Sequence, residues 1–113
     1  MTPRALPLLL LSLMASPALA FECSFDTECM ETEACADSAF LVDVLVDDKI
    51  LSTEFGDLTI VAIKQDTAFM ALFATGSGAE YMMSVTPDAA RLTTHINEGP
   101  MSITYLGHCK EAF

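Results

Sequence analysis

Hydrophobic and polar residues alternate along much of the chain after residue 35, and this period of two is typical of β-strands. The segment FLVDVLVD (40–47) is the clearest case, because Phe40 and three valines occupy one face while Asp43 and Asp47 lie on the other. The same alternation recurs later in the chain, in EYMMSVT (80–86), AARLTTHI (89–96) and MSITYLGHC (101–109). Each of these segments therefore predicts a half-buried strand of an antiparallel sheet.

Three further segments are predicted to be strands on less regular patterns. A short strand is expected at 50–55, and LTIVAIK (58–64) is a more continuously apolar strand. AFMALFA (68–74) is apolar on both faces, and its Met, Ala and Leu would suit a helix. Because this segment is too short for a typical helix, we interpret it as a strand.

Turn residues separate the predicted strands at roughly ten-residue intervals. They lie at Gly56-Asp57, Gln65-Asp66, 75–78, Pro87-Asp88 and 97–100. Regular turns between short strands predict consecutive hairpins. We therefore expect an all-β fold, a small antiparallel up-and-down barrel or curled meander of about seven to eight strands.

A barrel of this size is filled largely by its own side chains. We expect the aromatic residues Phe40, Phe69, Phe73, Tyr81 and Tyr105 to occupy the interior. The sequence therefore argues against a large lipid-type cavity.

The first twenty residues have the pattern of a secretory signal peptide. Arg4 gives a short positive region, LLLLSLM (8–14) gives the apolar region, and Ala18 and Ala20 give a cleavage site. Cleavage after Ala20 would leave residues 21–113 as a single β domain. A membrane-spanning helix would need about 20 apolar residues, and a lipoprotein would need a cysteine directly after the cleavage point. We therefore expect a periplasmic or secreted protein without a membrane anchor after cleavage.

An even number of cysteines in a short exported chain predicts disulfide bonds, and four cysteines allow three pairings. Cys23 shares a strand face with Phe21 and Phe25, and Cys109 lies on the more apolar face of 101–109. Both side chains would point inward, so face parity favours Cys23–Cys109. This bond would join the first strand to the last and would stabilise the fold by roughly 4–5 kcal/mol.

The remaining pair, Cys29–Cys35, would close the short METEA turn and contribute roughly 2–2.5 kcal/mol. A short helix is the alternative, because Thr27 is a good N-cap and is followed by helix-forming residues. Residues six apart in a helix are separated by about 9 Å. A disulfide bond needs Cα atoms within about 7 Å, so the two structures exclude each other and we predict the disulfide-closed turn.

The chain is strongly acidic, with 16 Asp and Glu against 5 Lys and Arg and a formal net charge of −11. Loss of the signal would leave Lys49, Lys64, Arg91 and Lys110 as the basic residues. Nucleic acid and anionic lipid are disfavoured as partners because both require clustered Lys and Arg. The charge favours a basic protein or a cation as the partner; alternatively, it only keeps an exported monomer soluble.

No catalytic set is apparent in the sequence. Ser77 lies in a Gly-Ser-Gly turn, but a nucleophile elbow would require glycine at the positions of Thr75 and Ala79. No spacing of histidine, carboxylate and nucleophile suggests a triad. We assign no catalytic residue and expect that the protein is not an enzyme.

Histidine and methionine are the remaining candidates for chemistry, because both suit copper in an oxidising compartment. The candidates are His95, His108, Met30, Met70, Met82, Met83 and Met101. Met83 and Met101 fall on core faces, where methionine usually packs, and the histidines fall on polar faces. We therefore predict no metal site and no cofactor.

Two resemblances add to these predictions. The segments FECSF, ETEACADSAF and GPMSITYLGHC resemble small exported proteins of alphaproteobacteria, a resemblance that implies no activity. An early aromatic-x-Cys, SGAEY (77–81) and a late cysteine resemble the periplasmic inhibitors of c-type lysozyme (the MliC-like family). That family is a small antiparallel β-barrel that plugs the lysozyme cleft with a serine-bearing loop and a later lysine.

On this resemblance, Ser77 and Tyr81 match the S-G-A-x-Y motif, and Cys23 and Cys109 match the disulfide positions. The later lysine and the tryptophan before it have no counterpart, since Arg91 stands out of register. The sequence thus predicts a non-catalytic exported module that binds a protein partner, with Ser77 and Tyr81 as contact residues. A periplasmic copper-binding protein that uses the histidines and methionines is the alternative.

Overall fold

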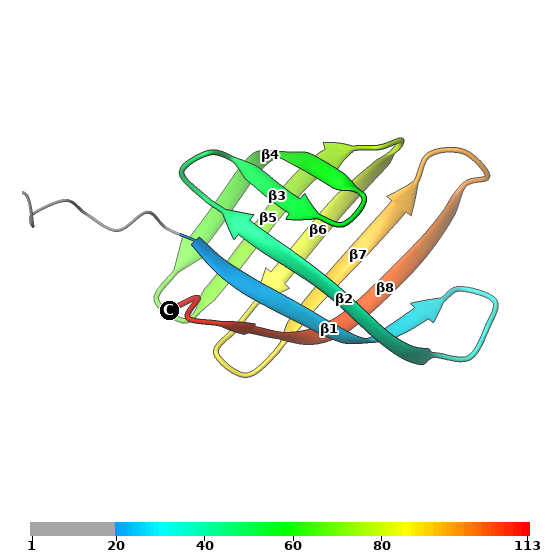
Figure 1. Ribbon diagram of the computed structural model, residues 1–113, viewed down its shortest axis with the longest axis horizontal. Coiled ribbons are helices and arrows are strands. Elements are labelled where there is room, and N and C mark those ends of the chain that lie inside the picture. The colour runs from blue at the N-terminus through cyan, green and yellow to red at the C-terminus, as the bar shows by residue number, and fades with distance from the viewer. Residues whose placement is uncertain (1–19) are drawn as a thin grey trace, which may run out of the picture.

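The protein is described by a computed structural model over residues 20–113, which form an eight-stranded antiparallel barrel (Figure 1). The strands pair in chain order, and the last closes on the first, which confirms the predicted up-and-down barrel. They are β1 (Ala20–Met30), β2 (Ala36–Leu45), β3 (Ile50–Thr53), β4 (Gly56–Asp66), β5 (Phe69–Gly76), β6 (Ala79–Val85), β7 (Ala90–Ile96) and β8 (Met101–Lys110).

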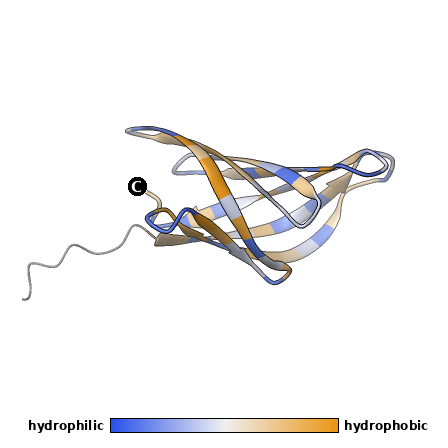
Figure 2. Cartoon of the chain, turned by 90° about the horizontal axis from the view of Figure 1, so that it is seen from above, coloured by the Kyte–Doolittle hydropathy of each residue, from blue (hydrophilic) through white to orange (hydrophobic). Residues whose placement is uncertain are grey.

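The predicted signal peptide lies outside the described residues except for Ala20, which begins β1. Within 20–113 there is no helix long and apolar enough to cross a membrane. The segment 68–74, apolar on both faces, is confirmed as a strand. Hydrophobic and hydrophilic residues follow one another along the strands, as the two-residue period requires (Figure 2).

The barrel closes where β1 pairs with β8, and a disulfide bond crosses this seam. Cys23 is directly opposite Cys109 in the ladder, and the two sulfurs are bonded. Gly107 lies opposite Phe25 on the same seam, so close that a Cβ atom there would collide with the backbone of Ser24 and Phe25. The pairing predicted from face parity is therefore confirmed, and it joins the two ends of the domain.

The second disulfide bond, Cys29–Cys35, closes the connection between β1 and β2. The chain passes from Met30 into a hydrogen-bonded turn, in which Glu33 N donates to Met30 O at 3.2 Å, and re-enters the sheet at Ala36. The disulfide-closed turn is confirmed and the alternative helix is not formed there.

Two strands carry β-bulges that change which residues face the interior. On β1 the register shifts at Asp26, so that Glu28, opposite Tyr105, and Met30, opposite Ile103, share the inner face. On β4 the register shifts at Val61. This second bulge explains why 58–64 shows no clean alternation, since the inward positions change parity within the strand.

The half of the barrel near the chain termini is filled by apolar side chains. Its most buried large residues include Phe25, Ile60, Leu72, Met83 and Val85. Met83 Sδ lies 3.9 Å from Cys23 Sγ, so this methionine packs on the disulfide bond. The core therefore surrounds the bond that closes the barrel.

The predicted interior aromatics are confirmed in part. Phe40, Tyr81 and Tyr105 belong to the core or pack against it. The prediction is wrong for Phe69 and Phe73: Met70, Leu72 and Ala74 are the buried face of β5, and Phe73 is 41% exposed beside Met82. Because β5 is apolar on both faces, its sequence does not indicate which face turns inward.

Candidate binding site

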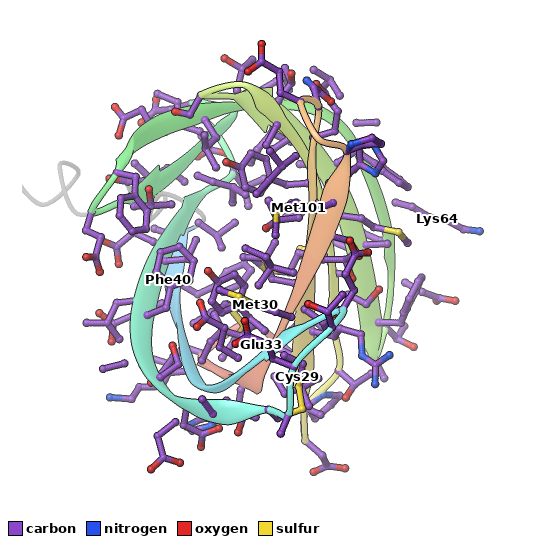
Figure 3. The ribbon with its side chains drawn as sticks, turned by 90° about the vertical axis from the view of Figure 1, so that its right-hand side faces the viewer. Cys29, Met30, Glu33, Phe40, Lys64 and Met101 are labelled. Atoms are coloured by element: carbon purple, nitrogen blue, oxygen red, sulfur yellow. A yellow bond between two sulfur atoms is a disulfide. The ribbon has the colours of Figure 1, made fainter. Side chains whose placement is uncertain are left out.

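One end of the barrel, here called the mouth, lies opposite the chain termini (Figure 1). It is formed by the turns at 31–35, 54–55, 77–78 and 97–100. Seen from this end, Met30, Met101 and Phe40 lie within the ring of strands, whereas Lys64 points away from it (Figure 3). The mouth therefore presents apolar side chains to solvent.

A pocket of about 340 Å³ occupies the mouth and extends into the barrel. Its lining combines aromatic and aliphatic side chains with the hydroxyl groups of serine, threonine and tyrosine. The lining comprises Phe40, Phe55, Tyr81 and Tyr105; Val42, Leu51, Leu58, Ala79, Leu92, Ile96 and Ile103; and Thr53, Ser77 and Thr94. The interior is thus filled at the terminal half and open at the mouth. This volume lies at the lower end of the range of about 300–1,000 Å³ usual for small-molecule pockets.

The aromatic side of the pocket is a row of three adjacent rings that are tilted against one another. Phe40 lies between Tyr105, at 4.8 Å between ring centroids, and Phe55, at 5.8 Å. Phe25 supports the row from the core, 6.4 Å from Phe40. Phe55 is 71% exposed although it lines the pocket, so its ring forms the outer edge of this wall.

Thr94 is the polar residue buried in the described core. It is 7% exposed, lines the pocket, and lies between Tyr81 and Ile103 on the neighbouring strands. Its hydroxyl makes no hydrogen bond to any side chain or turn of residues 20–113. Buried hydroxyls are nearly always paired, so this group is available to a hydrogen-bonding ligand in the pocket.

Two carboxylates stand beside the aromatic row. Glu28 and Glu54 line a hollow that shares Phe40, Phe55 and Tyr105 with the mouth pocket. Burial, and then the hydrogen bond to the Glu28 carboxylate, raises the pKa of the Tyr105 phenol to about 12, with a smaller contribution from Glu54. The phenol therefore remains neutral at physiological pH.

Tyr81, on the opposite wall, behaves similarly. Burial raises the pKa of its phenol, and the charge of Glu80 raises it further. Glu80 itself points outward, where it accepts a hydrogen bond from Asn97 Nδ2 at 3.0 Å. Hydrogen bonds from Asn97 and Thr75 hold the pKa of the Glu80 carboxyl below its usual value.

The turn that carries Ser77 is fixed in position at the rim. Gly76 pairs with Ala79, so that Ser77 and Gly78 form a two-residue hairpin with φ of 55° and 78°. Asn97 N donates to Gly78 O at 3.1 Å, which ties this turn to the next one around the mouth. Ser77 and Tyr81, the two residues predicted to contact a partner, are both part of the pocket lining.

Charge is unevenly divided between the two ends of the barrel. The basic residues of 20–113 all lie in the terminal half: Lys49 in a turn, Lys64 and Lys110 near strand ends, and Arg91 near a strand start. Among the described residues, the mouth half has Asp and Glu but no Lys or Arg; its acidic residues are Glu28, Glu31, Glu33, Asp37, Glu54, Asp57, Glu80 and Glu98. A cation approaching the pocket is therefore not repelled by any lysine or arginine of residues 20–113 at this end.

The residues considered for copper are distributed over different surfaces. Met70 and Met83 are buried in the core, whereas Met82 is exposed on the outer wall. His95 lies opposite Ser102 and His108 opposite Ser24, both on the outer face. Among residues 20–113 no three His, Cys, Asp or Glu side chains form a group able to hold a metal ion.

The sequence missed three residues of this site. Glu28 turns inward only because of the bulge at Asp26, which has no clear signal in the sequence. Thr94 shares its face with Leu92 and Ile96, a parity that marks it as inward, but an unpaired hydroxyl is visible only in three dimensions. Phe55 carries a signal, since an aromatic residue between Glu54 and a turn glycine is unusual for a solvent-facing turn.

Comparison with known proteins gives no match: no family model, no curated protein and no solved structure is significantly similar to this chain. The class of protein therefore rests on the fold and the site alone. It is a disulfide-bonded antiparallel β-barrel with an apolar pocket at an acidic mouth. Its two disulfide bonds fit an oxidising compartment.

Proposed function

We propose that the protein is a non-catalytic, exported binding module that takes a basic protein partner at the barrel mouth. One observation carries the proposal: the pocket that contains Ser77 and Tyr81 opens at the end of the barrel where residues 20–113 place no lysine or arginine. An apolar depression within a charged rim is the usual anatomy of a protein interface. Like-signed acidic groups would attract a basic partner and increase its rate of association.

The resemblance of 77–81 to lysozyme inhibitors names a first partner to test, because c-type lysozymes are basic. We expect the protein with residues 21–113 to bind such a lysozyme, with an affinity that falls as salt is raised. Binding is measured by calorimetry and inhibition by clearance of a cell-wall suspension. A pull-down from a periplasmic extract extends the search to other basic proteins.

Matched variants locate the interface. Glu54→Gln and Glu98→Gln each remove one charge from the mouth, whereas Asp88→Asn removes one from a turn at the terminal end. We expect both mouth variants to weaken binding by about threefold and the control to leave it unchanged. Equal losses at both ends would refute an interface at the mouth. No salt-sensitive partner and no inhibition at micromolar concentration would refute the proposed function.

Export is part of the same proposal. It is supported by the signal pattern of residues 1–20 and by the two disulfide bonds. We expect the protein recovered outside the cytoplasm to begin at Phe21. Mass measurement of the intact, unreduced chain checks both the cleavage and the two bonds. A recovered chain that begins at Met1 would refute this part.

A further inference from the structure

The mouth pocket combines features that select for one kind of chemical group. Its volume of about 340 Å³ and its largely apolar wall suit a compact apolar body. Thr94 adds an unpaired hydroxyl, nine-tenths buried, that lies inside this apolar space. A bound molecule that brings a hydrogen-bonding group would satisfy it.

The surroundings of the pocket define the charge of that molecule. Glu28 and Glu54 line the neighbouring hollow, which shares the side chains of Phe40, Phe55 and Tyr105 with the pocket. The Tyr105 phenol interacts with Glu28 and remains neutral, so it adds no charge of its own. Among residues 20–113, no lysine or arginine lies at the mouth beside either carboxylate.

The aromatic row provides a second attraction for positive charge. The exposed ring of Phe55 and the adjacent ring of Phe40 form the edge of the pocket, 5.8 Å apart between centroids. Aromatic faces attract ammonium and guanidinium groups, most strongly where water is partly excluded. An anionic ligand would instead meet two carboxylates and, within 20–113, no lysine or arginine at this end.

We infer that the mouth pocket binds an organic cation, an apolar body that carries one ammonium or guanidinium group. The apolar body packs against the aliphatic wall near Leu92, and the cation lies beside the aromatic row and Glu28. The source of this group rests on the proposed function: an exposed side chain of the basic partner supplies it. The chemistry of the group rests on the pocket alone.

Three probes with the same apolar body test this chemistry: 4-phenylbutylamine, 4-phenylbutanol and 4-phenylbutanoate. Each is titrated into the disulfide-bonded protein at neutral pH and followed by calorimetry. We expect the amine to bind about tenfold more tightly than the alcohol, and the carboxylate to bind most weakly. The amine should lose affinity as salt is raised, and the alcohol should not. Equal affinities for the three probes, or tightest binding of the carboxylate, would overturn the inference.

Variants then assign the binding to this pocket. Ala79→Leu places three extra carbons in the lining, whereas Ala62→Leu makes the same change on the exposed outer wall. We expect the first to abolish amine binding and the second to retain it. Equal binding by Ala79→Leu and the wild-type protein would place the amine elsewhere and overturn the inference.

Two further variants preserve the volume of the pocket, so they remain informative if Ala79→Leu does not fold. Thr94→Val replaces only the hydroxyl, by a methyl group, and should weaken binding of the amine by about threefold or more. The double variant Glu28→Gln, Glu54→Gln should reduce the preference for amine over alcohol to about threefold or less, with the alcohol unaffected. An unchanged preference in the double variant would overturn the role of these carboxylates.

The two proposals fail in different ways. If a basic protein binds in a salt-sensitive manner and the amine neither binds nor competes, the inference is overturned and the proposed function stands. If the amine binds as expected and no basic protein binds, the chemistry of the pocket is supported and the proposed partner is refuted. Competition between the amine and the basic protein supports both.

Discussion

At the scale of single residues, Thr94 carries the strongest signal of a binding site. An unpaired hydroxyl in a buried, largely apolar space costs about 1–3 kcal/mol. Thr94 is 7% exposed and lines the pocket, so this cost lowers the folding stability of the free protein. Thr94 therefore lowers the stability of the free protein, and in our proposal its hydroxyl gains a hydrogen-bonding partner when the ligand binds.

Thr94→Val tests this conflict between stability and binding. Valine keeps the shape and removes the unpaired hydroxyl, so we expect the free energy of unfolding to rise by about 1 kcal/mol. Urea unfolding of the disulfide-bonded protein measures it. Thr93→Val, at the neighbouring position on the outer face of β7, is the control and should change stability little. A loss of stability in Thr94→Val would show that the hydroxyl is already paired.

The two tyrosines give a titration that reports on the mouth. Burial and Glu28 raise the pKa of Tyr105 to about 12, and burial raises the pKa of Tyr81 as well. The pKa of Tyr105 in the folded protein lies above the value of 10.0 that applies to the unfolded chain. The contribution of Tyr105 to stability is therefore present below pH 10 and is lost as the pH rises toward 12.

Ultraviolet absorbance of the phenolate between pH 9 and 13 measures both pKa values. Glu28→Gln should lower the pKa of Tyr105 but leave it above 10.0, since burial is the larger cause of the raised pKa. Glu22→Gln, at the terminal end of β1, should leave it unchanged. Two tyrosines that titrate together near 10.0 would contradict the described packing of the mouth.

At the scale of elements, the seam between β1 and β8 decides whether the barrel closes. Cys23–Cys109 spans 86 positions in the chain, whereas Cys29–Cys35 spans 6. Because longer loops lose more entropy when they are closed, we expect removal of the first bond to cost roughly 4–5 kcal/mol and removal of the second roughly 2–2.5 kcal/mol. Double cysteine-to-alanine variants, compared by urea unfolding, measure both costs. Equal costs for the two pairs would contradict this account of the seam.

Gly107 tests the same seam without removing a bond. A methyl group at Gly107 would collide with backbone atoms of Ser24 and Phe25. Backbone atoms cannot move aside as the end of a flexible side chain could. We expect Gly107→Ala to cost about 3 kcal/mol or more. Gly78→Ala is the control: its Cβ meets nothing within 4 Å, and only the positive φ of 78° opposes it, for about 1–2 kcal/mol. The reverse order in thermal unfolding would refute close packing at the seam.

Most elements of this barrel could be predicted from the sequence because alternation and turn residues recur regularly. The strands follow from alternation, and face parity indicates the Cys23–Cys109 pairing, which leaves Cys29–Cys35 as the second bond. The exceptions share one cause: a bulge or a doubly apolar strand removes the parity signal. Glu28 turns inward after such a bulge, and Phe73 faces outward from such a strand. Of the site residues that the sequence does not indicate, Glu28 depends on this bulge, whereas the unpaired hydroxyl of Thr94 is visible only in the folded barrel.

At the scale of the whole molecule, the barrel has two unlike ends. The terminal half holds the core and all four basic residues of 20–113, whereas the mouth half holds the pocket and only acidic charge among lysine, arginine and the acids. The order of residues along the chain does not indicate this division, because segments of the two ends alternate in it. The antiparallel topology gathers every second turn at the mouth. Binding there leaves the core and the closing disulfide bond undisturbed.

The mouth is the end of the barrel at which we propose that this protein binds its ligand. Backbone amide spectra of the labelled protein, recorded during titration with 4-phenylbutylamine, test this proposal most directly. We predict chemical-shift changes that saturate and are confined to the mouth, around the turns at 54–55 and 77–78 and at Thr94. The turns at 46–49 and 86–89 at the terminal end should not respond. Changes centred on those terminal turns, or none at saturating amine, would contradict the account.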